Sequence, residues 1–126
     1  MWDAPAQGNI EQSVGMVVEA RINTYIVDDD VVYYIIEIID EDGDVYDLRK
    51  RYSELRDLHM TLQSNLDVPL PWFPPRALRL VNHLEPEFCH RRAYYLNIYV
   101  FHVVQTDYVR DEPALIEFFA RVSNDI

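Results

Sequence analysis

The chain has 126 residues, of which 49% are hydrophobic, and a formal net charge of -11. This length fits a single domain, and the hydrophobic content is enough for one packed core, which excludes widespread disorder. The negative charge argues against nucleic acid as a partner. No apolar run approaches the roughly 20 residues of a membrane-spanning helix. A lone cysteine, Cys89, cannot form an internal disulfide, which favours a reducing, cytoplasmic setting.

The charges are unevenly distributed along the chain. Between Arg49 and Arg92 the cations outnumber the acids by three, whereas the rest of the chain carries -14. Ten of the eleven cations are arginine, whose planar fork suits phosphate or carboxylate. This asymmetry indicates one local anion site on an acidic body. Ordinary solvated surface arginines are the alternative on composition alone.

The N-terminal part predicts a leader followed by a β-meander. Residues 1–13 show no periodicity and no signal-peptide pattern, so we expect a flexible leader before a domain at 14–122. The β-branched and aromatic stretches Val14–Ile26, Val31–Ile39 and Val45–Leu48 predict three strands. Polar turns separate them, and the Asp-Gly pair before the third is a strong hairpin signal. We therefore expect a three-stranded antiparallel meander.

The second half predicts helices. Leucines at helical spacing indicate a helix over Ser53–Leu66, with Ser53 as its N-cap. Four prolines in Pro69–Pro75 exclude helix and favour an extended, polyproline-like crossing. A longer helix is expected from Glu85 to about Gln105, with an apolar stripe of Leu96, Tyr99, Val100 and Val103, and a last one over Glu112–Val122. The predicted fold class is α+β.

Four stretches, in this order, resemble the phox-homology (PX) domain. Lys50–Leu55 is similar to the family's Arg-Tyr-Ser-Glu-Phe signature, with leucine in place of phenylalanine. Pro69–Pro75 resembles its proline-rich loop, and Arg76 stands where the family usually has a lysine. Glu85–Phe88 followed by Arg91–Tyr99 resembles its Arg-x-x-x-Leu-x-x-Tyr helix. The resemblance covers about residues 14–122 and implies the PX fold.

The resemblance implies that the domain binds the headgroup of a phosphoinositide. Arg51 would bind the 3-phosphate, Tyr52 would lie under the inositol ring, Arg76 would contact the 1-phosphate and Arg92 would bind the ring hydroxyls. Arg91 is expected on the surface. Other roles stay open: an ion pair of Arg51 with Asp47 or Glu54, a core position for Tyr52, a solvated Arg76, and an ion pair of Arg92 with Glu85 or Glu87.

The resemblance also implies a membrane-insertion segment after the prolines. Leu78, Leu80 and Val81 are its candidates, and Trp72 could lie at the interface because aromatic rings favour that depth. The alternative for Trp72, as for Phe73, is packing of the proline loop against the core. For Phe73 we favour packing.

The expected function is therefore non-catalytic recognition of phosphatidylinositol 3-phosphate, on endosomal membranes, in trafficking or signalling. We expect no enzyme activity, no cofactor and no metal site, since Asp40–Asp44 lacks the spacing of a calcium loop and no two histidines stand four residues apart. The alternative is a PX-like domain for protein interaction, through its acidic surface or its proline-rich loop.

Overall fold

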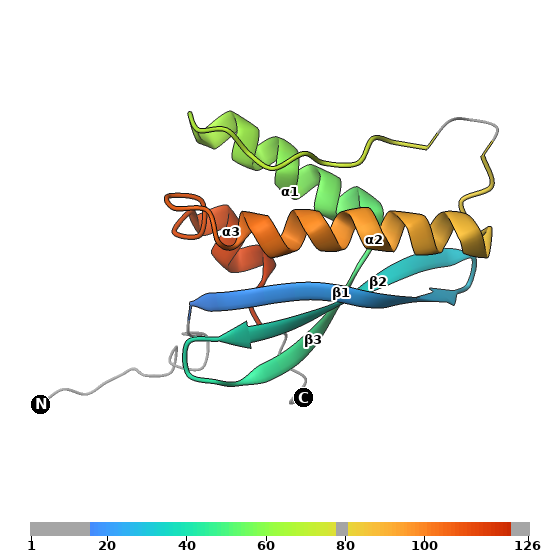
Figure 1. Cartoon of the computed structure of the whole chain (residues 1–126), viewed down its shortest axis with the longest axis horizontal. Helices are drawn as coiled ribbons and strands as arrows, with labels where there is room; N and C mark the ends of the chain where they lie inside the picture. The colour runs from blue at the N-terminus through green and yellow to red at the C-terminus, as the bar shows by residue number, and fades with distance from the viewer. Residues whose placement is uncertain (1–15, 78–80, 122–126) are drawn as a thin grey trace, which may run out of the picture.

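The computed structural model describes residues 16–77 and 81–121. Three antiparallel strands, β1 (Val17–Asp28), β2 (Val31–Asp40) and β3 (Val45–Lys50), form a sheet in that order. The helices α1 (Tyr52–Asn65), α2 (Pro86–Val103) and α3 (Pro113–Phe118) follow along the chain. All three helices lie on one side of the sheet, and the long α2 runs along β1 (Figure 1). The predicted α+β meander with a helical part is confirmed.

The strands alternate between core and surface, as a half-covered sheet requires. Along β2, Val32, Tyr34, Ile36 and Ile38 are buried, and the residues between them are only half-buried. The β1–β2 connection is a two-residue turn at Asp29–Asp30 with φ of 55° and 64°. Asparagine, aspartate and glycine tolerate this left-handed backbone. The tight turn lets β1 run two residues beyond the predicted end at Ile26.

The β2–β3 hairpin is held by a buried carboxylate. Asp40 is 4% exposed, and its Oδ1 accepts hydrogen bonds from the backbone N–H groups of Asp42, at 2.9 Å, and Asp44, at 3.0 Å. Gly43 occupies the left-handed region with φ of 85°, as the predicted Asp-Gly turn requires. The Asp40 carboxylate thus has a structural role in this turn.

Helix α1 begins one residue before the prediction, and Ser53 is not its N-cap. Arg51 occupies the N-cap position, and its backbone N–H donates to Glu54 Oε1 at 2.8 Å. This contact is half of a capping box, in which the N3 glutamate satisfies the N-cap amide. The predicted leucine face is confirmed, since Leu55, Leu58 and Leu62 are buried.

The last two helices differ from expectation in length. Helix α2 has Pro86 in its first turn and a fully buried apolar stripe, as predicted, but ends at Val103, short of Gln105. Helix α3 ends at Phe118, well before the predicted Val122, which lies outside the described residues. The Phe119 carbonyl accepts a hydrogen bond from the Tyr46 hydroxyl of β3 at 2.7 Å, which anchors the chain just after the end of α3.

The proline-rich segment crosses the helices without regular secondary structure and packs through Phe73. The Phe73 ring stacks on His59 of α1 at a centroid distance of 5.0 Å and meets Tyr99 of α2 edge-on at 4.9 Å. Phe73 therefore packs against the core, as favoured from the sequence. None of the described helices is both long and apolar enough to cross a membrane.

Candidate anion-binding site

A pocket of about 250 Å³ lies where the β1–β2 hairpin, the start of α1, the end of the proline-rich segment and the start of α2 meet. Its lining residues come from all four segments: Asp30, Val31, Val32, Tyr34, Arg51, Tyr52, Ser53, Arg76, Ala77, His83, Phe88 and Arg92. We call this cavity the arginine pocket. Segments far apart in the sequence build it, so no single motif could have shown its shape.

Three arginines line the arginine pocket from three different segments. Arg51 caps the N-terminus of α1, where free backbone N–H groups favour an anion. Arg76 follows the prolines, and Arg92 projects from α2. Arg51 and Arg76 are exposed, whereas Arg92 is only 9% exposed. The sequence-predicted cations thus share one cavity, as a phosphate site needs.

Arg92 is held in place by two rings and a carbonyl. Its Cζ lies 3.7 Å from the centroid of the Tyr52 ring and 4.7 Å from that of Phe88. Its Nη2 donates to the Pro75 carbonyl oxygen at 2.9 Å. Burial lowers the pKa of Arg92, but a guanidinium stays charged and has five N–H donors, so donors remain for a ligand. No ion pair of Arg92 with Glu85 or Glu87 occurs among the described residues.

Tyr52 connects the arginine pocket to the proline-rich segment. Its hydroxyl donates to the Pro74 carbonyl oxygen at 2.8 Å, and its half-buried ring lies 5.5 Å from that of Phe73. Burial raises the pKa of the Tyr52 hydroxyl, and the nearby cations, Arg92 first, oppose this shift. The phenol therefore stays neutral, and the Arg92 guanidinium covers one face of its ring.

The sequence did not indicate several of the residues that line the arginine pocket. The polar turn of Asp28–Asp30 was predicted, but not that Asp30 lines the pocket. His83 and Phe88 lie in or next to the predicted Glu85–Phe88 motif without an assigned role. Spacing along the chain says nothing about which face of a turn meets another segment, so no sequence signal could have found Asp30.

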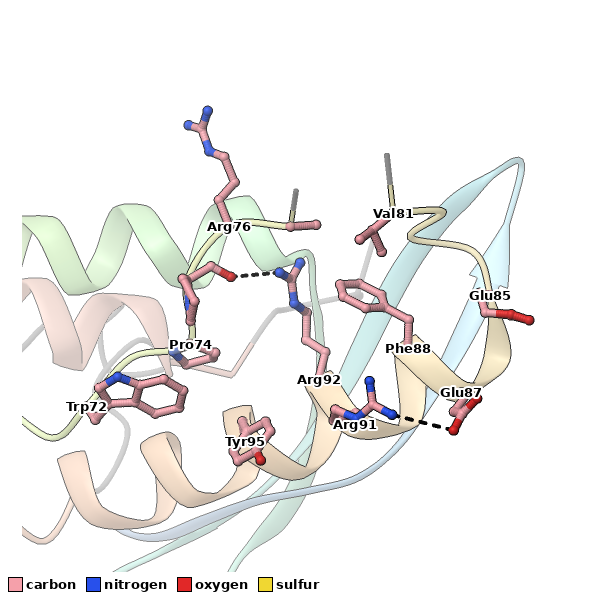
Figure 2. Close-up of a pocket in the computed structure, with 12 residues that line it drawn as sticks. Trp72, Pro74, Arg76, Val81, Glu85, Glu87, Phe88, Arg91, Arg92 and Tyr95 are labelled. Atoms are coloured by element: carbon pink, nitrogen blue, oxygen red, sulfur yellow. Dashed lines mark hydrogen bonds and ion pairs between the residues drawn. The ribbon is translucent and has the colours of Figure 1, made fainter. Parts of the chain in front are cut away.

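A second cavity, of about 460 Å³, adjoins the first between the proline-rich segment and α2. It shares Arg76, Ala77, Phe88 and Arg92 with the arginine pocket, and most of its other lining is apolar. We call it the apolar groove (Figure 2). In Figure 2 the guanidinium of Arg76 extends away from Arg92, so Arg76 stands at the rim of both cavities.

The groove contains two of the four predicted membrane-insertion residues. Trp72 is 62% exposed and meets Tyr95 edge-on at a centroid distance of 5.6 Å, and Val81 is also exposed. Leu78 and Leu80 lie outside the described residues. Arg91 is exposed and pairs with Glu87 at 3.4 Å, which agrees with its predicted surface position.

One group of acids has a geometry that could hold a cation. The carboxylates of Asp40, Asp42 and Asp44 offer oxygens within 4.8 Å of one another. The Asp40 carboxylate already accepts two backbone hydrogen bonds of the hairpin, and this group lies in the β2–β3 turn, which contributes no residue to the arginine pocket. Its structural role accounts for the arrangement.

The comparisons with known proteins agree with this fold. The chain is a small α+β domain in which a three-stranded sheet, three helices and a proline-rich crossing surround a cavity lined by arginines. The family model described as "PX domain" matches residues 41–121, and the chain belongs to this family. A solved structure, the "X-ray structure of a designed CISK-PX domain", is similar with a TM-score of 0.72 at 20% identity, over 80% of this chain and 97% of that one. No curated protein sequence matches.

Family membership defines the general function. PX domains are phosphoinositide-binding modules that target proteins to membranes as peripheral binders, and they are generally non-catalytic. The structural likeness, at 20% identity, supports the fold alone. The identity of the lipid, the target membrane and the roles of individual residues therefore depend on the geometry of the site.

Proposed function

We propose that the domain recognises phosphatidylinositol 3-phosphate and brings its protein to endosomal membranes for trafficking or signalling. The observation that carries the proposal is that Arg51, Arg76 and Arg92, from three segments, line one cavity beside Tyr52, with Arg76 at its rim. In this proposal Arg51 binds the 3-phosphate, Arg76 the 1-phosphate and Arg92 the ring hydroxyls.

The chemistry of each group suits its proposed role. A phosphomonoester offers fixed acceptor oxygens that an arginine fork binds bidentately. Arg51 stands at the N-terminus of α1, where the helix dipole adds to its attraction for phosphate. Arg92, fixed by Pro75 and two rings, is preorganised to donate to hydroxyls without losing much side-chain entropy.

Membrane attachment needs more than the pocket, because the chain carries a net charge of -11 and an anionic surface repels it. In this proposal the exposed side chains of Trp72 and Val81, with Leu78 and Leu80, enter the interface next to the bound headgroup. Burial of one large apolar side chain contributes roughly 1.5–3 kcal/mol, which suits a reversible anchor.

The test is sedimentation with phosphatidylcholine vesicles that contain one phosphoinositide at a time. We expect binding to vesicles with phosphatidylinositol 3-phosphate and little to plain phosphatidylcholine. Arg51→Ala should weaken binding at least about thirtyfold, because it removes one partner of a charged, hydrogen-bonded contact.

Arg91→Ala is the matched control, since it removes the same charge from a residue that lines the groove but not the arginine pocket. Unchanged binding by Arg51→Ala would refute the assignment of the pocket. Absence of lipid binding by the unmodified domain, together with capture of a basic or aromatic-lined protein partner, would favour the protein-interaction alternative.

A further inference from the structure

Asp30 is an acid in a pocket otherwise suited to anions. Among the described lining residues of the arginine pocket it is the sole carboxylate, beside three arginines. It is the second residue of the β1–β2 turn and is exposed. Its neighbours differ: Asp29 does not line the pocket, and Asp28 pairs with Arg49 at 3.6 Å. No ion pair of the described residues involves Asp30, so none of the described cations neutralises it by direct contact.

The hairpin wall of the arginine pocket, which carries Asp30, differs in charge from the other walls. The hairpin contributes Asp30 with Val31, Val32 and Tyr34, and carries none of the arginines that line the pocket. All the arginines come from α1, the proline-rich segment and α2. Of the four segments that line the pocket, the hairpin is therefore the one whose lining residues include no arginine, and Asp30 is its charged group.

The charge of the pocket lining can be compared with the charge of a phosphoinositide headgroup. Three arginines and one aspartate give the lining a charge of +2 when His83 is neutral. A headgroup with one phosphodiester and one phosphomonoester carries about -2.5 to -3, and each further phosphomonoester adds about -1.5 to -2. The charge of the described lining already falls short of that of the singly phosphorylated headgroup by about half a unit to one unit, and a second phosphomonoester widens this gap.

We propose that Asp30 is a specificity-determining residue, which restricts the arginine pocket to headgroups with a single phosphomonoester by repelling a second one at the hairpin wall. The inference rests on the proposed function and deepens it. It differs from the assignment of the arginines, because these attract any phosphoinositide, whereas Asp30 discriminates against the more highly phosphorylated ones.

A purely structural role for Asp30 is the competing explanation, and the turn provides a matched control. Both Asp29 and Asp30 have positive φ, and asparagine tolerates that backbone equally well. Asp30→Asn removes the charge at the pocket wall, and Asp29→Asn removes the same charge one residue away, outside the lining. Asp30→Gly is a second variant, since glycine adopts this turn without strain.

The experiment measures vesicle affinity for phosphatidylinositol 3-phosphate, 3,4-bisphosphate and 3,5-bisphosphate, with thermal unfolding as a check on folding. We expect the unmodified domain and Asp29→Asn to prefer the monophosphate. In Asp30→Asn and Asp30→Gly the ratio of bisphosphate to monophosphate affinity should rise about tenfold, as expected from loss of repulsion between a carboxylate and a dianion across a solvated pocket.

Two results would overturn the inference while leaving the proposed function in place. One is an unmodified domain that binds a bisphosphate as tightly as the monophosphate. The other is a ratio that stays the same in both Asp30 variants, or that shifts equally in Asp29→Asn. An unmodified domain that binds none of the three lipids would instead refute the proposed function itself, and the inference with it.

Discussion

The arginine pocket and the apolar groove share a wall and differ in almost everything else. The pocket of about 250 Å³ has the more polar lining, with arginines from three segments. Beyond the shared wall, the groove of about 460 Å³ is lined mostly by apolar residues, namely two prolines, Trp72, Val81 and Tyr95, together with Glu85, Glu87 and Arg91. The shared wall is formed by Arg76, Ala77, Phe88 and Arg92. A polar cavity and a more apolar one thus lie side by side on one small domain, as the proposed headgroup recognition and membrane contact require.

Hydrogen bonds to the proline-rich segment couple the two cavities at this shared wall. Prolines have no N–H to donate, so the proline-rich segment is held through its carbonyls. Tyr52 donates to Pro74 and Arg92 donates to Pro75, at 2.8 and 2.9 Å. The side chains proposed to read the headgroup therefore also position the segment that carries Trp72.

The largest expected combined loss of lipid binding and stability comes from breaking this shared wall. Arg92→Ala should weaken lipid binding more than tenfold and lower the free energy of unfolding by about 1.5–3 kcal/mol, because a charged hydrogen bond to a carbonyl is lost. Arg92→Lys keeps the charge without the planar fork. Its lipid affinity and stability should therefore lie between those of Arg92→Ala and those of the unmodified domain. Vesicle sedimentation and urea unfolding measure both effects.

Arg91→Ala tests whether position or charge matters. This neighbour is exposed and has only a surface pair with Glu87, so its loss should change stability by less than about 0.5 kcal/mol. Equal effects of the two alanine variants would contradict a distinct role for Arg92 at the wall.

A smaller effect should separate the groove from the pocket. Trp72→Ala should weaken binding to vesicles about tenfold, as expected from loss of one partly inserted aromatic side chain. Its affinity for the soluble headgroup, inositol 1,3-bisphosphate, should stay unchanged. Calorimetry with this headgroup and sedimentation with vesicles measure the two separately.

The control for Trp72→Ala is Val45→Thr, a change at an exposed position at the start of β3 that lines neither cavity. A parallel loss of vesicle and headgroup affinity in Trp72→Ala would show that the groove and the pocket do not act separately.

The smallest expected effect concerns His59, whose ring stacks on Phe73 of the proline-rich segment. Its Nδ1 lies 3.0 Å from the Tyr99 hydroxyl, and burial lowers the pKa of its imidazole. The unfolded chain therefore binds this proton more readily than the folded domain. Stability should be unaffected above the unfolded pKa of about 6.5, should fall as the pH drops from there toward the lowered pKa of the folded domain, and should level off below it.

Thermal unfolding between neutral and mildly acidic pH tests this effect. His59→Gln should have a shallower pH dependence than the unmodified domain, whereas the exposed His102→Gln should match it. A pH dependence that is identical in all three proteins would exclude His59 as its source.

Much of the fold was predictable because its signals are local. The β-branched and aromatic strand Val31–Ile39, the Asp-Gly hairpin and the stripe of Leu96, Tyr99, Val100 and Val103 on α2 depend on short-range geometry, and each is confirmed. The errors lie at element ends. The cap at Arg51 uses Glu54 in place of a serine hydroxyl, and α3 stops beside the Tyr46 contact to Phe119, a partner 73 residues away.

The sequence by itself determined the class of the domain and the arginines and tyrosine from which a headgroup site could be built, because these residues belong to short motifs with fixed spacing. Tertiary structure alone decided that Arg51, Arg76 and Arg92 line one cavity, that Arg92 is fixed by Pro75, Tyr52 and Phe88, and that Asp30 joins them from the hairpin. Contacts between distant segments depend on how the packed helices and sheet bring side chains together, and no local pattern encodes that distance.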